Sequence, residues 1–110
     1  MKIAVPTDDG EIISKDFSRS RGFVVATVND SGIIRREMRW NLLSEMMTSE
    51  SGYLYNLCDC NAVIVKEIGS CHYKRLETEK KKVVRTKDTL VSMAFSNYLE
   101  KIMIPEPATG

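Results

Sequence analysis

Cys71 and His72 are the adjacent residues best suited to chemistry in this chain of 110 amino acids. They follow a stretch, NAVIVKEIGS, with the pattern of a buried strand, a turn and a helix start. Unpaired N–H groups and the helix dipole favour a thiolate or an anion in the first helical turn. We therefore predict a ligand-binding site there. The alternative is that one of the two side chains packs under the helix and the other faces solvent.

The elements on either side of this pair have to position it. Ala62–Val65 is a continuous apolar run, typical of a central strand covered on both faces. Gly69 is predicted to take a positive φ at the exit from the strand. Ser70 is predicted to be the N-cap of the helix.

Three basic residues are placed to reach the same end of the sheet. Arg19 and Arg21 lie in the weakly patterned segment 11–21, and Lys66 directly follows the central strand. Together they would make a positive mouth for an anionic ligand. The alternative is scattered, solvated charge, which we also expect of the run Lys80-Lys81-Lys82.

Two other kinds of site fit the sequence less well. Cys58 and Cys60 precede the central strand whereas Cys71 and His72 follow it, roughly 20 Å away, which disfavours one four-ligand metal site. Cys60 and its neighbour are better explained as a core residue beside a surface one. A two-metal nuclease would need converging carboxylates, and only Asp8 or Asp9 with Glu67 offer a pair.

The remaining pattern predicts an α/β fold in a single domain over residues 1–104. Strands are expected at 2–6, 22–28, 33–40, 62–65 and 83–84, with a hairpin turn at Asn29-Asp30-Ser31-Gly32. Helices are expected within 41–58, after Gly69, and from a cap at Asp88, the last with an apolar stripe that starts at Leu90. This order implies a five-stranded mixed sheet with flanking helices. Residues 105–110 are predicted to be a disordered tail.

Composition limits the partners. A net charge of +1 argues against a general grip on nucleic acid, and no apolar run approaches the length of a membrane span. Three cysteines without a secretion signal indicate reduced thiols and a cytoplasmic location.

The chain resembles the dinitrogenase iron–molybdenum cofactor biosynthesis family, of the NifX and NifB C-terminal type. The matching stretches run in order along the chain: MKIAVPTDDG, Ser14 with Asp16-Phe17-Ser18-Arg19, GFVVATV, Asp59-Cys60 before AVIV, Ile68-Gly69, and the closing amphipathic helix. Two differences stand out: NLLSEMMTSES lies where many relatives are histidine-rich, and Lys66-Glu67-Ile68-Gly69 lies where they are glycine-rich.

The resemblance implies a ribonuclease H-like fold without enzymatic activity. It also implies that the protein binds or carries an iron–sulfur or iron–molybdenum cluster, or its precursor, between cluster-assembly and cluster-acceptor proteins. By this analogy Cys71 and His72 would be the direct ligands, with Arg19, Lys66, Gly69 and Ser70 around the cluster. The alternative is a metal-free module of the same fold that binds an anion or docks a protein.

Overall fold

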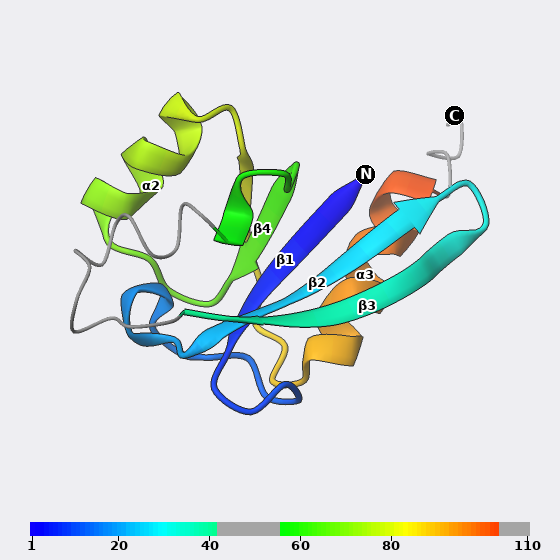
Figure 1. The fold of residues 1–110 in the computed structure, drawn as a ribbon, viewed down its shortest axis with the longest axis horizontal. Helices are drawn as coiled ribbons and strands as arrows, with labels where there is room; N and C mark the ends of the chain where they lie inside the picture. Colours follow the sequence, from blue (N-terminus) through cyan, green and yellow to red (C-terminus); the bar gives the residue numbers. More distant parts are fainter. Residues whose placement is uncertain (42–55, 104–110) are drawn as a thin grey trace.

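A computed structural model describes residues 1–41 and 56–103. Its core is a five-stranded mixed sheet with the order β3-β2-β1-β4-β5 (Figure 1). The strands are β1 (Lys2–Thr7), β2 (Gly22–Asn29), β3 (Gly32–Trp40), β4 (Ala62–Val65) and β5 (Lys82–Arg85). The predicted fold class is confirmed, and the strand order is compatible with a ribonuclease H-like arrangement.

The sheet is antiparallel on one side and parallel on the other. β1 pairs antiparallel with β2, and β2 with β3, through the predicted hairpin that ends with Asn29 opposite Gly32. β4 lies parallel to both β1 and β5. The carboxyl ends of β1 and β4 therefore lie side by side at one end of the sheet. Loops that follow parallel strands at such a place commonly bind ligands.

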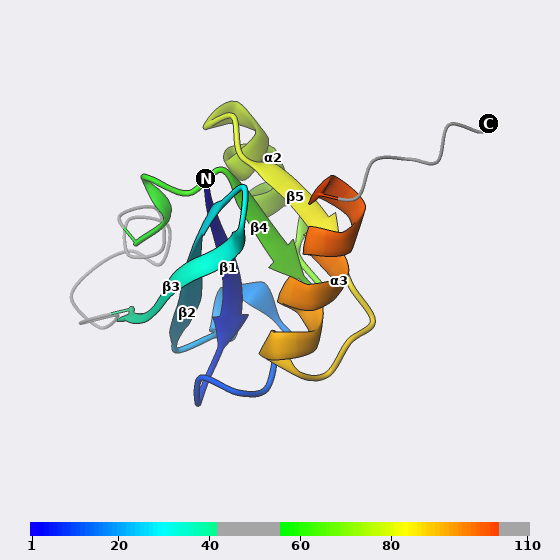
Figure 2. The same cartoon turned by 90° about the vertical axis from the view of Figure 1, so that its right-hand side faces the viewer.

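Each face of the sheet is covered by a different apolar cluster. The helix α3 (Val91–Met103) packs Val91, Ala94, Phe95 and Tyr98 on one face. The other face carries Leu76 of α2 (Ser70–Thr78), Leu57, Cys60 and Phe17 of the short 3-10 helix η1 (Phe17–Arg19). Figure 2 shows α3 beside β4 and β5, with α2 beyond them. The alternating strand residues explain the two clusters, because successive side chains point to opposite faces.

Two details of α3 differ from the prediction. Asp88 does not cap the helix, since its carboxylate accepts hydrogen bonds from the Thr86 hydroxyl (2.8 Å) and the Asn97 amide (2.9 Å). Leu90 precedes the helix, forms a bridge with Ile12 and is 45% exposed. The helix therefore begins later than the cap-like Asp88 suggests.

The predicted helix within 41–58 lies outside the described residues except for its end, where Asn56 and Leu57 are helical. The predicted tail 105–110 also lies outside them. No described helix is both long and apolar enough to cross a membrane.

Candidate functional site

The loop after β4 leads directly into α2, as predicted, but the helix start is built differently. Gly69 has φ −70° and ψ 152°, so the predicted positive φ is wrong. Gly69, not Ser70, is the N-cap, and no side chain caps the helix. Ser70 instead occupies the first helical position, and the Gly69 carbonyl accepts a hydrogen bond from the Tyr73 amide (2.9 Å). The shift of one residue keeps Cys71 and His72 in the first turn.

The segment that holds η1 packs against this helix start. The Phe17 amide donates to the Glu67 carbonyl (3.1 Å), and Asp16 forms a parallel bridge with Glu67. The Phe17 ring, 2% exposed, lies 5.9 Å from the His72 ring, centroid to centroid. These contacts bring together two segments that lie about fifty residues apart in the chain.

η1 itself is held by Asp16. Its carboxylate accepts from the Ser18 amide (3.0 Å) and the Ser18 hydroxyl (2.9 Å). Its other oxygen lies 4.0 Å from Nε of Arg19, whose side chain is 87% exposed. Arg19 thus projects into solvent on the segment next to His72.

Between the two loops lies a hollow of about 380 Å³, lined by Lys15, Asp16, Glu67, Ile68 and Gly69. Its charged lining is one lysine and two carboxylates, so an anion would depend on basic groups at the rim. Cys71 is exposed and His72 is half-buried beside this region.

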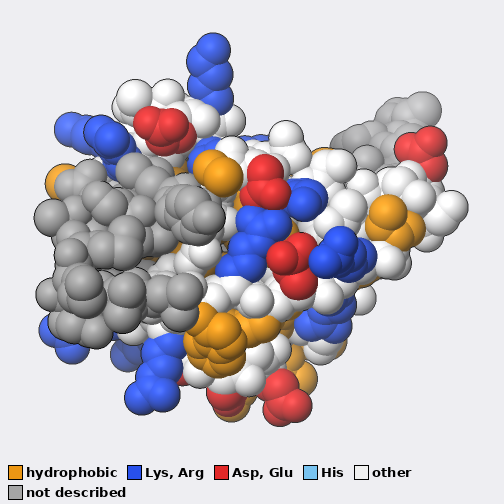
Figure 3. All heavy atoms as spheres, in the orientation of Figure 1, with side chains coloured by type: hydrophobic (Ala, Val, Ile, Leu, Met, Phe, Trp, Pro, Cys, Tyr) orange, Lys and Arg blue, Asp and Glu red, His pale blue; other side chains and the backbone are white. Residues whose placement is uncertain are grey.

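The other two predicted basic residues, Arg21 and Lys66, do not line this hollow. Arg21 is exposed, and its amide donates to the Asp8 carboxylate (2.9 Å). Lys66 is half-buried. Hydrogen bonds from Asn97 and Thr86 are the main reasons that the pKa of Asp88 is lowered, and the charge of Lys66 adds to this effect. Basic and acidic side chains are interspersed on the described part of the face in Figure 3, in keeping with the net charge of +1.

The remaining cysteines lie before β4, at its opposite end. All three cysteines are free thiols; Cys58 is exposed and Cys60 is buried. Burial, the largest cause, raises the pKa of the Cys60 thiol to about 11. Cys60 is therefore a protonated core residue at neutral pH, as its position next to the strand indicates.

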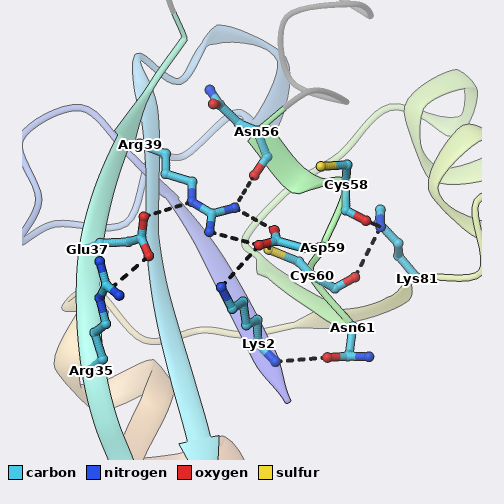
Figure 4. Close-up of polar contacts among 10 residues, drawn as sticks. All are labelled: Lys2, Arg35, Glu37, Arg39, Asn56, Cys58, Asp59, Cys60, Asn61 and Lys81. Atoms are coloured by element: carbon cyan, nitrogen blue, oxygen red, sulfur yellow. Dashed lines mark hydrogen bonds and ion pairs between the residues drawn. The ribbon is translucent and has the colours of Figure 1, made fainter.

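Sequence reasoning missed the polar contacts that hold this segment (Figure 4). Arg39 binds the Asp59 carboxylate through both terminal nitrogens (2.6 and 3.0 Å) and donates to the Asn56 carbonyl (2.8 Å). Lys2 also reaches Asp59 (3.1 Å). The hydrogen bond from Arg39 is the main reason that the pKa of Asp59 lies far below its usual value. The one sequence signal was the Asp59-Cys60 pair that precedes the central strand.

The prediction that the run Lys80-Lys81-Lys82 is solvated is wrong for Lys81, which is 8% exposed. Its ammonium donates to the carbonyls of Cys60 (3.1 Å) and Cys58 (3.3 Å). The chain reverses after α2 through Lys80, at φ 63°, and this turn directs Lys81 inward. A triple lysine in a turn looks fully solvated in sequence because the turn geometry is not visible there.

Metal ligands are sparse. Within residues 1–41 and 56–103, no three His, Cys, Asp or Glu side chains are grouped closely enough to hold a metal ion. Asp16 lies beside Glu67, but within the described chain Asp8 does not complete a three-carboxylate group with them, and the nuclease hypothesis gains no support.

The chain is thus a small α/β protein with a mixed sheet and a polar hollow at the loop that joins the central strand β4 to α2. The chain belongs to the dinitrogenase iron-molybdenum cofactor family, which it matches over residues 1–101. Membership associates it with the biosynthesis of that cofactor, and the resemblance found in the sequence is confirmed.

Solved structures share the fold. A Methanocaldococcus jannaschii protein provisionally described as a dinitrogenase is 22% identical, with a TM-score of 0.74, covering 92% of this chain and 89% of that one. The apo form of the orange protein from Desulfovibrio gigas is 20% identical, with a TM-score of 0.73 and coverages of 97% and 92%. A Thermotoga protein provisionally described as NifB is 18% identical, with a TM-score of 0.71 and coverages of 99% and 95%. No curated protein matches the chain significantly.

Proposed function

We propose that this protein is a small, non-enzymatic accessory protein of the cytoplasm that binds an iron–sulfur or iron–molybdenum cluster, or its precursor. It would carry this cargo between cluster-assembly and cluster-acceptor proteins. The family supports the general role, and three free thiols suit a reducing compartment.

The observation that carries the proposal is the contact between η1 and the start of α2. It sets Arg19 on the segment that packs against His72, one residue from the exposed Cys71. Thiolate and imidazole are common ligands of such clusters, and a guanidinium stabilises their negative charge. Lys66, Gly69 and Ser70 would lie around the bound cargo.

Two protein ligands do not fill the coordination of an iron–sulfur cluster, which is usually held by four. This small number suits a carrier, because the open positions remain available to the protein that takes the cluster. It suits a resident redox cofactor less well.

Anaerobic reconstitution with iron and sulfide tests the proposal. We expect wild type to take up iron and the C71A/H72A double variant to lose most of it. Cys58→Ala is the matched control, because Cys58 is also an exposed thiol but lies before β4. Equal uptake by wild type and the double variant, or equal loss in Cys58→Ala, would contradict the assignment.

A metal-free module that binds an anion is the second candidate. The helix start offers just two candidate metal ligands, the Cys71 thiol and the His72 imidazole, and the hollow beside it is lined by a lysine, Lys15. Both features favour this candidate. Binding of inorganic phosphate by metal-free protein, lost in Arg19→Ala, together with no iron uptake, would select this candidate over the first.

A further inference from the structure

A second polar hollow, of about 520 Å³, lies between the loop after β5 and the last turns of α3. Arg85, Lys87 and Lys101 line it, together with the carboxylates of Asp88 and Glu100. Figure 2 shows this loop, drawn in yellow and orange, running back along α3. A hollow of this size is large enough for a small ligand or for a few residues of an extended chain.

Hydrogen bonds fix the loop on one side of this hollow. The Asp88 carboxylate accepts from the Thr86 hydroxyl and from the Asn97 amide of α3. The Asp88 amide donates to the Thr86 hydroxyl (3.1 Å), and the Thr86 amide donates to the Val65 carbonyl at the end of β4 (2.8 Å). The loop is therefore tied both to α3 and to the sheet, so its backbone is held in one place.

The cations of the hollow are not paired within the described chain. The side chains of Lys87 and Lys101 are exposed, and they form no ion pair or hydrogen bond with another described residue. The same holds for Arg85, whose guanidinium lies 6.0 Å from the centre of the Tyr73 ring. By contrast, Arg39 is bound to a carboxylate of its own chain. The three charged groups are therefore available to an anionic partner.

Positive charge outweighs negative charge around the hollow. Besides its hydrogen bonds, the charges of Lys101 and Lys66 help to lower the pKa of Asp88, so Lys66 also acts on this region. With Arg85 and Lys87, four cations stand against two carboxylates. The surplus attracts an anion, and the interspersed carboxylates disfavour a compact polyanion.

We propose that this hollow binds an acidic segment of a partner protein, with carboxylates of the segment on Arg85, Lys87 and Lys101. Three separate cations suit carboxylates spaced along an extended chain, whereas a single phosphate is best held by converging donors. Asp88 and Glu100 are acceptors for main-chain N–H groups of the same segment.

The hollow lies beside the proposed cargo site. Val65 pairs with Arg85 in the parallel register of β4 and β5, and the loop that follows Val65 lines the cargo hollow. A partner held at the end of β5 is therefore next to the cargo. That this partner is a cluster-assembly or cluster-acceptor protein rests on the proposed function, whereas the binding of an acidic segment does not.

An amide NMR titration of the metal-free full chain tests the proposal, with the peptide acetyl-Glu-Gly-Glu-Gly-Glu-Gly-amide as the probe. We expect the signals of residues 85–88 and 97–101 to shift, with a dissociation constant of about 1 mM at low salt, because exposed ion pairs are individually weak. High salt should abolish the shifts. The same peptide with glutamine in place of glutamate should not bind.

Charge reversal at matched positions locates the site. Lys87→Glu and Lys101→Glu should each weaken binding of the glutamate peptide at least about threefold. Lys82→Glu is the control, because Lys82 is an exposed lysine at the start of β5 and its reversal changes the net charge equally. It should weaken binding less than about twofold.

Four results would overturn the proposal: no shifts at residues 85–88 and 97–101, equal binding of the glutamine peptide, equal weakening by Lys82→Glu and Lys87→Glu, or inorganic phosphate bound at these residues as tightly as the peptide. The last result would make the hollow a site for small anions. Iron uptake is measured separately, so failure of peptide binding is distinguishable from failure of the proposed cargo site.

Discussion

Single residues decide how the segment before β4 is held. Arg39 binds both oxygens of Asp59 and also the Asn56 carbonyl, while Lys81 binds the carbonyls of Cys58 and Cys60. Two cations thus hold the end of a short helical turn, where free carbonyls favour positive charge. These contacts fix the entry to the central strand and, through it, the position of the helix start.

Asp59→Asn should lower the free energy of unfolding by about 1–2 kcal/mol at pH 7, because the Arg39 side chain is only 15% exposed and loses a charged partner. The pKa of Asp59 is lowered in the folded state, so its contribution is complete above the unfolded value of about 3.9 and falls as the pH drops below it. Urea unfolding at pH 7 and pH 3 measures both effects.

The difference between wild type and Asp59→Asn should shrink at pH 3. A difference that stays constant between the two pH values would mean that the carboxylate charge is not what stabilises the segment. Asn29→Asp is a useful comparison, since it adds a carboxylate in the β2–β3 turn, away from Arg39.

At the scale of elements, the end of α2 is unusual. The amide of Lys81 donates to the Leu76 carbonyl and that of Lys80 to the Glu77 carbonyl (both 2.9 Å), the hydrogen-bond pattern of a Schellman motif. Lys80 occupies its left-handed position, with φ 63°, where glycine is usual. A side chain with a Cβ is strained in this region.

Lys80→Gly should therefore raise the free energy of unfolding by about 1 kcal/mol, measured by urea unfolding. Lys74→Gly is the matched control: it removes a lysine from the interior of the same helix, and it should destabilise by a similar amount. Destabilisation by Lys80→Gly would show that the lysine side chain itself stabilises the turn.

The strands and the last helix were readable from sequence because their apolar patterns are strong. Ala62–Val65 is buried on both faces, and Val91, Ala94, Phe95 and Tyr98 repeat as one buried stripe. The ends of elements were not readable, because they depend on geometry. Ser70 and Asp88 both have the residue types of N-caps, yet Gly69 is the N-cap of α2 and α3 begins at Val91.

The candidate site was predictable only in part. The topology brings the loops after β1 and β4 together, which follows from two parallel strands. The carboxylates of Asp16 and Glu67 in the hollow, and the contact between Phe17 and His72, depend on the path of segment 11–21. That segment has no regular pattern from which its path could be derived.

At the scale of the whole molecule, the two ends of the central strand β4 have different roles. The carboxyl ends of β1 and β4 present the proposed cargo site. The opposite end of β4 is held by the contacts of Arg39 and Lys81.

The most direct test of the cargo site is a map of paramagnetic broadening in the amide NMR spectrum of the protein loaded anaerobically with an iron–sulfur cluster. We predict that signals of residues 15–19 and 66–73 broaden most, while those of residues 30–36, at the far end of the β2–β3 hairpin, stay sharp. Broadening centred on Cys58 and Asn61 instead, at the opposite end of β4, would contradict it.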